Sequence, residues 1–293
     1  TGSLEILNLA NNELEVIPGV ECLSTFSQLI RLNLSNNKIY ALGSDGGLGN
    51  LTCLQVLNLS GNILESLPED LGCIGSTLLS INLSNNNLRW LPSTLNELHG
   101  LRLLDVSRNQ LTTLPNSIIG LKDLVEINGG RNKIAMIPET FGSLLKLEII
   151  NFQHNNLRTL PETIGLLTRL QQIDLRNNRL IDLPREMGSW ILLRELDVRS
   201  NKIQTLPASC GHCHRLKSLN MHNNSIECIP HTVSTLIHLE IFDLGQNQLK
   251  SLSAGIGKAT SLLKLDLGGN VNLHSLPRTI GHLGKLKQLN LSS

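Results

Sequence analysis

The 293-residue chain carries 25 lysines and arginines against 24 aspartates and glutamates, and only 2% of its residues are aromatic. The charge balance argues against a dedicated nucleic-acid or acidic-membrane binder, and the few aromatic rings leave little surface for stacking bases or sugars. No apolar run approaches the roughly 18 residues of a membrane span, and the first residues show no signal-peptide pattern. We therefore expect a cytoplasmic protein without a membrane span.

A repeat of 23 to 25 residues runs along the whole chain. Its frame is L-x-x-L-x-L-x-x-N-x-L-x-x-L-P, and three successive copies occupy 167–184, 190–207 and 213–230. In chain order the first leucine of the frame stands at positions 4, 29, 54, 78, 101, 124, 147, 170, 193, 216, 239, 262 and 286. Twelve frames are complete and a thirteenth is cut short. We expect a single repeat domain over residues 1–293, without terminal caps and hence a fragment of a longer array.

Two further columns of the frame indicate how successive turns stack. An asparagine recurs in all twelve full frames, and its amide can bond the backbone groups of adjacent turns that would otherwise be buried and unpaired. All ten prolines also share one column, where a fixed φ and a missing N–H suit a chain that leaves the strand. Two frames have Gly43 or Ser253 in place of the proline.

This pattern resembles the leucine-rich repeat family over essentially the whole chain. The resemblance implies an α/β repeat solenoid of horseshoe shape. Each x-x-L-x-L-x-x segment would form a short strand of a parallel sheet on the concave side. The following L-P-x-x-I-G-x-L-x-x segment would form a turn and a short helical or irregular stretch on the convex side. No repeat can bury its own leucines, so stability would come from stacked neighbours.

The 23-residue form with L-P-x-x-I-G-x-L is most similar to the intracellular Ras-associated group. That group includes Ras-pathway scaffolds, Scribble-type scaffolds and the repeat regions of Roco proteins. The resemblance implies a non-enzymatic signalling scaffold whose protein partner is a Ras-like small GTPase, or a phosphatase or kinase component. Two alternatives stay open: the recognition arm of a larger enzyme such as a Roco GTPase-kinase, and an extracellular receptor or adhesion ectodomain.

Residues 210–214, CGHCH, match the C-x-x-C-H attachment signature of a c-type haem and also offer zinc ligands. The repeat frame gives a simpler explanation. Cys210 falls in the same apolar column as Ile164, and Cys213 falls in the column of Leu167. Because a free cysteine behaves as a small hydrophobic residue, we expect both thiols in the core and neither a metal nor a cofactor site.

No catalytic motif is present in the sequence. The chain lacks G-x-x-x-x-G-K-[ST], H-E-x-x-H and G-x-S-x-G, and its nine histidines are scattered over different turns. We therefore expect no enzymatic activity and no cofactor. N-x-S/T sequons occur, several of them by-products of the strand frame, and a glycan on Asn58 or Asn223 would favour the extracellular alternative.

The candidate binding surface is the predicted concave face. Between its two strand leucines every frame carries Asn or Asp, and six consecutive frames follow the strand with a basic or titratable side chain that we expect on one side. The predicted partner-binding residues are Arg108, Arg131, His154, Arg176, Arg199, His222, Asp105, Asp174 and Asp197. Arginine makes bidentate carboxylate contacts and is favoured at interfaces, so this strip predicts docking of an acidic protein surface. The interleaved acids argue against a nucleic-acid track, and a merely solvated charged surface is the alternative.

Overall fold

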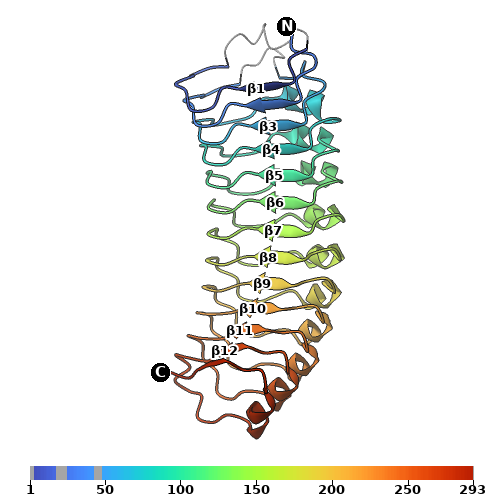
Figure 1. Ribbon diagram of the computed structural model, residues 1–293. Coiled ribbons are helices and arrows are strands. Elements are labelled where there is room, and N and C mark those ends of the chain that lie inside the picture. Colours follow the sequence, from blue (N-terminus) through green and yellow to red (C-terminus); the bar gives the residue numbers. More distant parts are fainter. Residues whose placement is uncertain (1–2, 18–24, 43–47, 293) are drawn as a thin grey trace. The chain divides into compact units, whose positions relative to one another are not determined.

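The computed structural model describes residues 3–17, 25–42 and 48–292. The chain divides into two compact units, an N-terminal unit of residues 1–147 and a C-terminal unit of residues 148–293. Within each unit the strands lie side by side in chain order (Figure 1). The predicted fold class, a leucine-rich-repeat solenoid built on parallel strands, is confirmed.

The N-terminal unit contains strands of three residues that pair in parallel and four 3₁₀ helices. The strands are β1 Ile6–Asn8, β2 Arg31–Asn33, β3 Val56–Asn58, β4 Ser80–Asn82, β5 Leu103–Asp105 and β6 Glu126–Asn128. The 3₁₀ helices are η1 Glu69–Ile74, η2 Ser93–Glu97, η3 Asn116–Gly120 and η4 Glu139–Ser143.

The C-terminal unit repeats the same alternation. Its strands are β7 Ile149–Asn151, β8 Gln172–Asp174, β9 Glu195–Asp197, β10 Ser218–Asn220, β11 Ile241–Asp243, β12 Lys264–Asp266 and β13 Gln288–Asn290. Its 3₁₀ helices are η5 Glu162–Leu166, η6 Arg185–Ser189, η7 Ala208–His212, η8 His231–Thr235, η9 Ala254–Lys258 and η10 Arg278–His282.

The strands bury one face only, as their two-residue period requires. In β5, for example, Leu104 is buried while Leu103 on the other face is 43% exposed. The buried leucines pack against the 3₁₀ helices, whose inward residues, such as Leu95 and Ile118, are also buried. Among the described residues of each unit, no helix covers the opposite face of the sheet, and we call it the exposed sheet face. It is the predicted concave face.

The proline column marks where each described 3₁₀ helix begins. Pro92 precedes η2 with φ −66° and ψ 158°. Its ring fixes φ in the extended conformation that precedes the helix. At η9 a serine takes this place, and the Oγ of Ser253 accepts the backbone N–H of Gly255 at 3.3 Å. A hydrogen bond there does what the proline ring does elsewhere. Pro18 and Gly43 lie outside the described residues.

The asparagine column bonds each turn to the preceding one, as predicted. The Nδ2 of Asn224 donates to the carbonyl oxygens of Val198 and Met221, both at 3.0 Å, and its Oδ1 accepts the N–H of Ile203 at 3.0 Å. Asn109 makes the equivalent three bonds in the N-terminal unit. These amides satisfy buried backbone groups that the short strands leave without a partner.

The two cysteines of CGHCH lie in the core, which confirms their assignment to the apolar columns. Cys210 and Cys213 are fully buried, and the Sγ of Cys213 donates to the carbonyl oxygen of Met187 at 3.3 Å. Burial raises the pKa of Cys210 to about 11 and that of Cys213 to about 12, so both stay protonated at neutral pH. The other described cysteines, Cys53, Cys73 and Cys228, are also free thiols.

The described residues contain no group of three or more histidine, cysteine or acidic side chains arranged to hold a metal ion. Over the same part of the chain, every helix is too short or too polar to cross a bilayer.

Candidate functional site

Each strand ends at the Asn or Asp that the sequence analysis placed in the binding strip. The Oδ1 of Asp105 accepts the backbone N–H of Ser107 at 2.8 Å, and Asp174 and Asp197 accept the N–H groups of Arg176 and Arg199 at 3.1 Å. The same bond to the residue two positions on follows the other strands, from Asn8 to Asn290. This side chain turns the backbone out of the sheet. The column therefore has a structural role that either residue type can fill.

The next turn of the backbone requires a left-handed residue. Arg108, Arg131 and His154 have φ of 54°, 57° and 54°, while Asn177 and Asn223 occupy the same column with φ of 55°. Asparagine adopts this conformation at little cost, whereas arginine and histidine do so under strain of about 1 kcal/mol. Basic residues therefore occupy this column although its backbone conformation favours asparagine.

The six basic or titratable residues of the predicted strip fall into two columns, one residue apart. Arg108, Arg131 and His154 hold the left-handed column, and the remaining three, Arg176, Arg199 and His222, hold the column before it. The position of the basic group moves by one residue between the frames of β7 and β8, because β8 is followed by Arg176–Asn177 where β7 is followed by Gln153–His154.

The two arginines of the predicted strip in the N-terminal unit are Arg108 and Arg131. Both are exposed, and no acidic side chain among the described residues lies within ion-pair distance of either guanidinium. Asp105 is half-buried and its Oδ2 accepts the Nδ2 of Asn128 at 3.3 Å. Two guanidinium groups thus face solvent beside the sheet.

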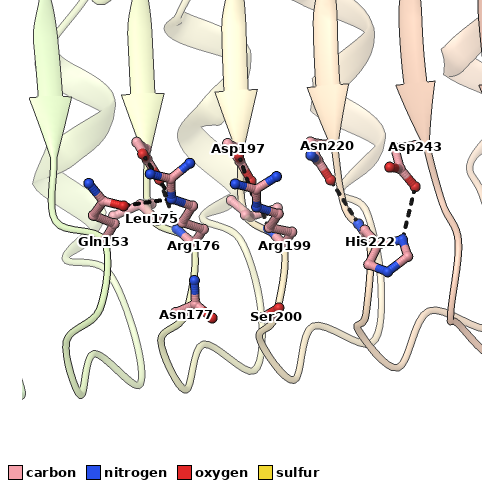
Figure 2. Close-up of polar contacts among 12 residues, drawn as sticks. Gln153, Leu175, Arg176, Asn177, Asp197, Arg199, Ser200, Asn220, His222 and Asp243 are labelled. Carbon is pink, nitrogen blue, oxygen red and sulfur yellow. Dashed lines mark hydrogen bonds and ion pairs between the residues drawn. The ribbon is translucent and has the colours of Figure 1, made fainter.

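In the C-terminal unit Arg176, Arg199 and His222 each lie beside a carboxylate. Figure 2 shows Arg199 beside Asp197 and His222 beside Asp243, just past the ends of the strands. The Nε atoms of Arg176 and Arg199 lie 3.5 Å from the Oδ2 atoms of Asp174 and Asp197. The Nδ1 of His222 lies 3.3 Å from the Oδ1 of Asp243.

A glutamine and a carboxylate that the sequence analysis did not single out complete this arrangement. Gln153 accepts the Nε of Arg176 at 2.6 Å, and Asp243 pairs with His222 across neighbouring turns. Burial raises the pKa of the Asp174 carboxyl, and the nearby charge of Asp197 adds to this, against the bonds from Arg176. The partly desolvated carboxylate row is a place where an external cation is favoured.

Apolar residues flank both sets of charges on the exposed sheet face. Ile6 is 62% exposed, Leu103 43% and Ile241 41%, while Val56 and Ile149 are half-buried. Exposed β-branched and leucine side chains next to charged groups give a surface that buries apolar area on binding and keeps polar contacts for specificity.

Comparison with known proteins agrees with this geometry. A family model described as leucine rich repeat matches residues 2–64, 130–180 and 191–249, and a second leucine rich repeat model matches residues 100–121. Comparison with curated proteins gives no match.

Solved structures supply close relatives of the fold. A leucine-rich-repeat protein of Leptospira interrogans is 32% identical with a TM-score of 0.87, and the match covers 96% of this chain and 70% of that one. The Listeria monocytogenes internalin InlF is 23% identical over 99% of this chain and 88% of its own, with a TM-score of 0.76. The plant peptide hormone receptor RGFR1, solved in complex with RGF2, is 25% identical over 99% of this chain and 56% of its own, with a TM-score of 0.70. With thirteen parallel strands, an asparagine in every full frame and family models that match more than half of its residues, the chain belongs to the leucine-rich repeat family.

Proposed function

We propose that this protein is a non-enzymatic scaffold that binds a protein partner through its exposed sheet face. The proposal rests on two basic side chains that this face exposes. Among the described residues, the guanidinium groups of Arg108 and Arg131 have no ion-pair partner, and both residues adopt a left-handed backbone conformation. A family whose fold typically serves as a binding module supports the same view.

The partner-binding residues in this proposal are the nine of the predicted strip. The unpaired arginines of the N-terminal unit suit an acidic surface, because a guanidinium makes bidentate bonds to carboxylates. By the resemblance to the intracellular Ras-associated group, the client is a Ras-like small GTPase, or a phosphatase or kinase component, and the protein acts in cytoplasmic signalling. In this proposal, catalysis, where it occurs, belongs to the partner.

Affinity capture with mass spectrometry tests this function. The wild type is compared with a variant that carries Arg131→Glu, Arg176→Glu and Arg199→Glu. We expect the variant to lose the captured partner. It should still unfold in one cooperative transition, at a somewhat lower melting temperature, because Arg176→Glu and Arg199→Glu remove the ion pairs with Asp174 and Asp197.

A matched control reverses three exposed arginines that lie outside the exposed sheet face, namely Arg158, Arg179 and Arg215. It carries the same change of net charge and should capture the partner normally. Retained capture by the first variant, or equal loss in both variants, contradicts the proposal.

A second candidate function is that of a receptor ectodomain, which the similarity to RGFR1 in complex with RGF2 favours. Asn223 is exposed and part of an N-x-S sequon, whereas Asn58 ends β3 and accepts the N–H of Ser60 at 3.0 Å. Glycan mapping of the native protein distinguishes the two candidates: a glycan on Asn223 favours the receptor, and an unmodified Asn223 favours the scaffold. The third alternative, the recognition arm of a Roco-type enzyme, calls for a longer reading frame with a phosphate-binding loop or kinase motif.

A further inference from the structure

A row of five side chains crosses the exposed sheet face of the C-terminal unit at right angles to its strands. The first residues of β7 to β11 pair in register from strand to strand. In order they are Ile149, Gln172, Glu195, Ser218 and Ile241. The row therefore runs apolar, amide, carboxylate, hydroxyl, apolar, with the acid at its centre.

Glu195 is the acidic group of this region that has no partner. It is exposed, and no cation among the described residues lies within ion-pair distance of its carboxylate. The other acids nearby are engaged: Asp174 and Asp197 pair with their arginines, and Glu240 pairs with Lys217 at 3.3 Å. Glu148 accepts the Nε2 of Gln171 at 2.7 Å.

A cavity of about 340 Å³ opens on the sheet at this point. Its lining includes Ile149, Gln172, Glu195 and Ser218 of the row, together with Asp174, Asp197 and Arg176. Asp174 and Asp197 already pair with Arg176 and Arg199, so Glu195 is the carboxylate of this lining that is left for a cation from outside. The volume admits one long side chain, whose charged head would reach Glu195.

We infer that this row binds a protein segment that places a lysine or arginine over Glu195 and an apolar residue over each of Ile149 and Ile241. Each isoleucine lies two strands from Glu195, which is about 9.6 Å at the usual strand spacing. A polyproline II segment advances about 9.3 Å in three residues and returns to the same side. The occupant is therefore an extended segment of the form apolar-x-x-basic-x-x-apolar. This inference rests on the proposed function and specifies the partner's chemistry at one place.

Selection of a random dodecapeptide library displayed on phage tests the inference. The targets are the wild type, Glu195→Arg, and Asp182→Arg as a control with the same charge change at an exposed acid outside the row. We expect wild type and Asp182→Arg to enrich a basic residue with apolar residues three positions before and after it. Glu195→Arg should bind those peptides at least about tenfold more weakly and should enrich an acidic centre instead.

Enrichment of the same consensus on wild type and Glu195→Arg, or the absence of a basic centre on wild type, overturns the inference. Retesting the selected peptides on Arg176→Glu/Arg199→Glu separates this failure from failure of the proposed function. If the selected peptides lack a basic centre but still bind that variant more weakly, the scaffold function stands and only the inference about Glu195 is refuted. If the peptides bind every sheet-face variant as well as the wild type, both are refuted. A cooperative thermal unfolding transition establishes that each variant is folded.

Discussion

The two units use one repeat frame to build different surfaces. In the N-terminal unit the basic residues occupy the left-handed column, and Arg108 and Arg131 find no intramolecular acid. In the C-terminal unit Arg176 and Arg199 stand one residue earlier, two residues after the Asp that ends the strand, and each pairs with it at 3.5 Å. A shift of one residue thus decides whether a guanidinium is available to a partner or already neutralised.

The asparagine column is the feature that the two units share, and breaking it should have the largest effect. Asn109→Ala and Asn224→Ala each leave one buried N–H group, that of Leu88 or Ile203, without its acceptor. The two carbonyl oxygens that each amide also bonds keep a bond from the asparagine of a neighbouring turn. We expect a loss of about 2 kcal/mol in the free energy of unfolding, measured by urea denaturation, at both sites. A loss well under about 1 kcal/mol at either site would show that water replaces the amide.

The buried thiols should make the C-terminal unit sensitive to alkali. The folded-state pKa values of Cys210 and Cys213, about 11 and 12, exceed the ordinary value of 9.0. The unfolded chain therefore loses these protons first, and stability that is complete below pH 9 falls as the pH rises toward 11 to 12. One pH unit above 9, each thiol lowers the free energy of unfolding by up to about 1.4 kcal/mol.

Denaturant titrations from pH 8 to pH 10 measure this loss. A variant with Cys210→Ala and Cys213→Val supplies the control and should show a flatter pH profile. Equal profiles for the two proteins would contradict the assignment.

The difference in pairing predicts a difference in binding. For an acidic partner, Arg108→Glu/Arg131→Glu should weaken affinity by about tenfold or more, because free guanidinium groups are replaced by repelling carboxylates. Arg176→Glu/Arg199→Glu should cost less, since those arginines already share their charge with Asp174 and Asp197. Calorimetry of both double variants measures the order, and the reverse order would place the acidic partner on the C-terminal unit.

The smallest effect concerns backbone strain. Arg131→Asn should raise the free energy of unfolding by about 0.5–1 kcal/mol, because asparagine adopts φ 57° more readily. Arg176→Asn should give no such gain, since Arg176 precedes the left-handed position and loses an ion pair. Arg131→Gln, which removes the charge without relieving the backbone, is the control. A gain from Arg131→Gln equal to that from Arg131→Asn would point to charge rather than strain.

The repeat frame predicted the fold because every turn restates it. The leucine columns, the asparagine bonds and the core location of Cys210 and Cys213 all followed from positions that recur in the frame. The strand-ending role of Asp105 and its equivalents was missed, although the restriction of that column to Asn or Asp was a visible signal. If this column served partner binding alone, its residue types would vary from repeat to repeat instead of being Asn or Asp throughout.

The pairing of the charges could not be predicted from the sequence. Whether Arg176 turns toward Asp174 or toward solvent depends on its rotamer and on Gln153 one turn away. The free carboxylate of Glu195 became apparent only once the surrounding acids had been matched with their partners. The spacing of residues along the chain predicts the fold. Which charged side chains are left unpaired for a partner depends on contacts that only the three-dimensional structure shows.

The asparagine bonds also affect how such a protein can change its length. The side chain of Asn224 bonds to its own turn and the turn before it, and the same bonds recur from repeat to repeat. Removing or duplicating one 23-residue module between matching positions of the C-terminal unit recreates every bond type at the new junction. Unequal recombination within the gene would therefore lengthen or shorten the row of recognition positions by whole modules. Binding specificity can then change through the number of repeats as well as through substitutions.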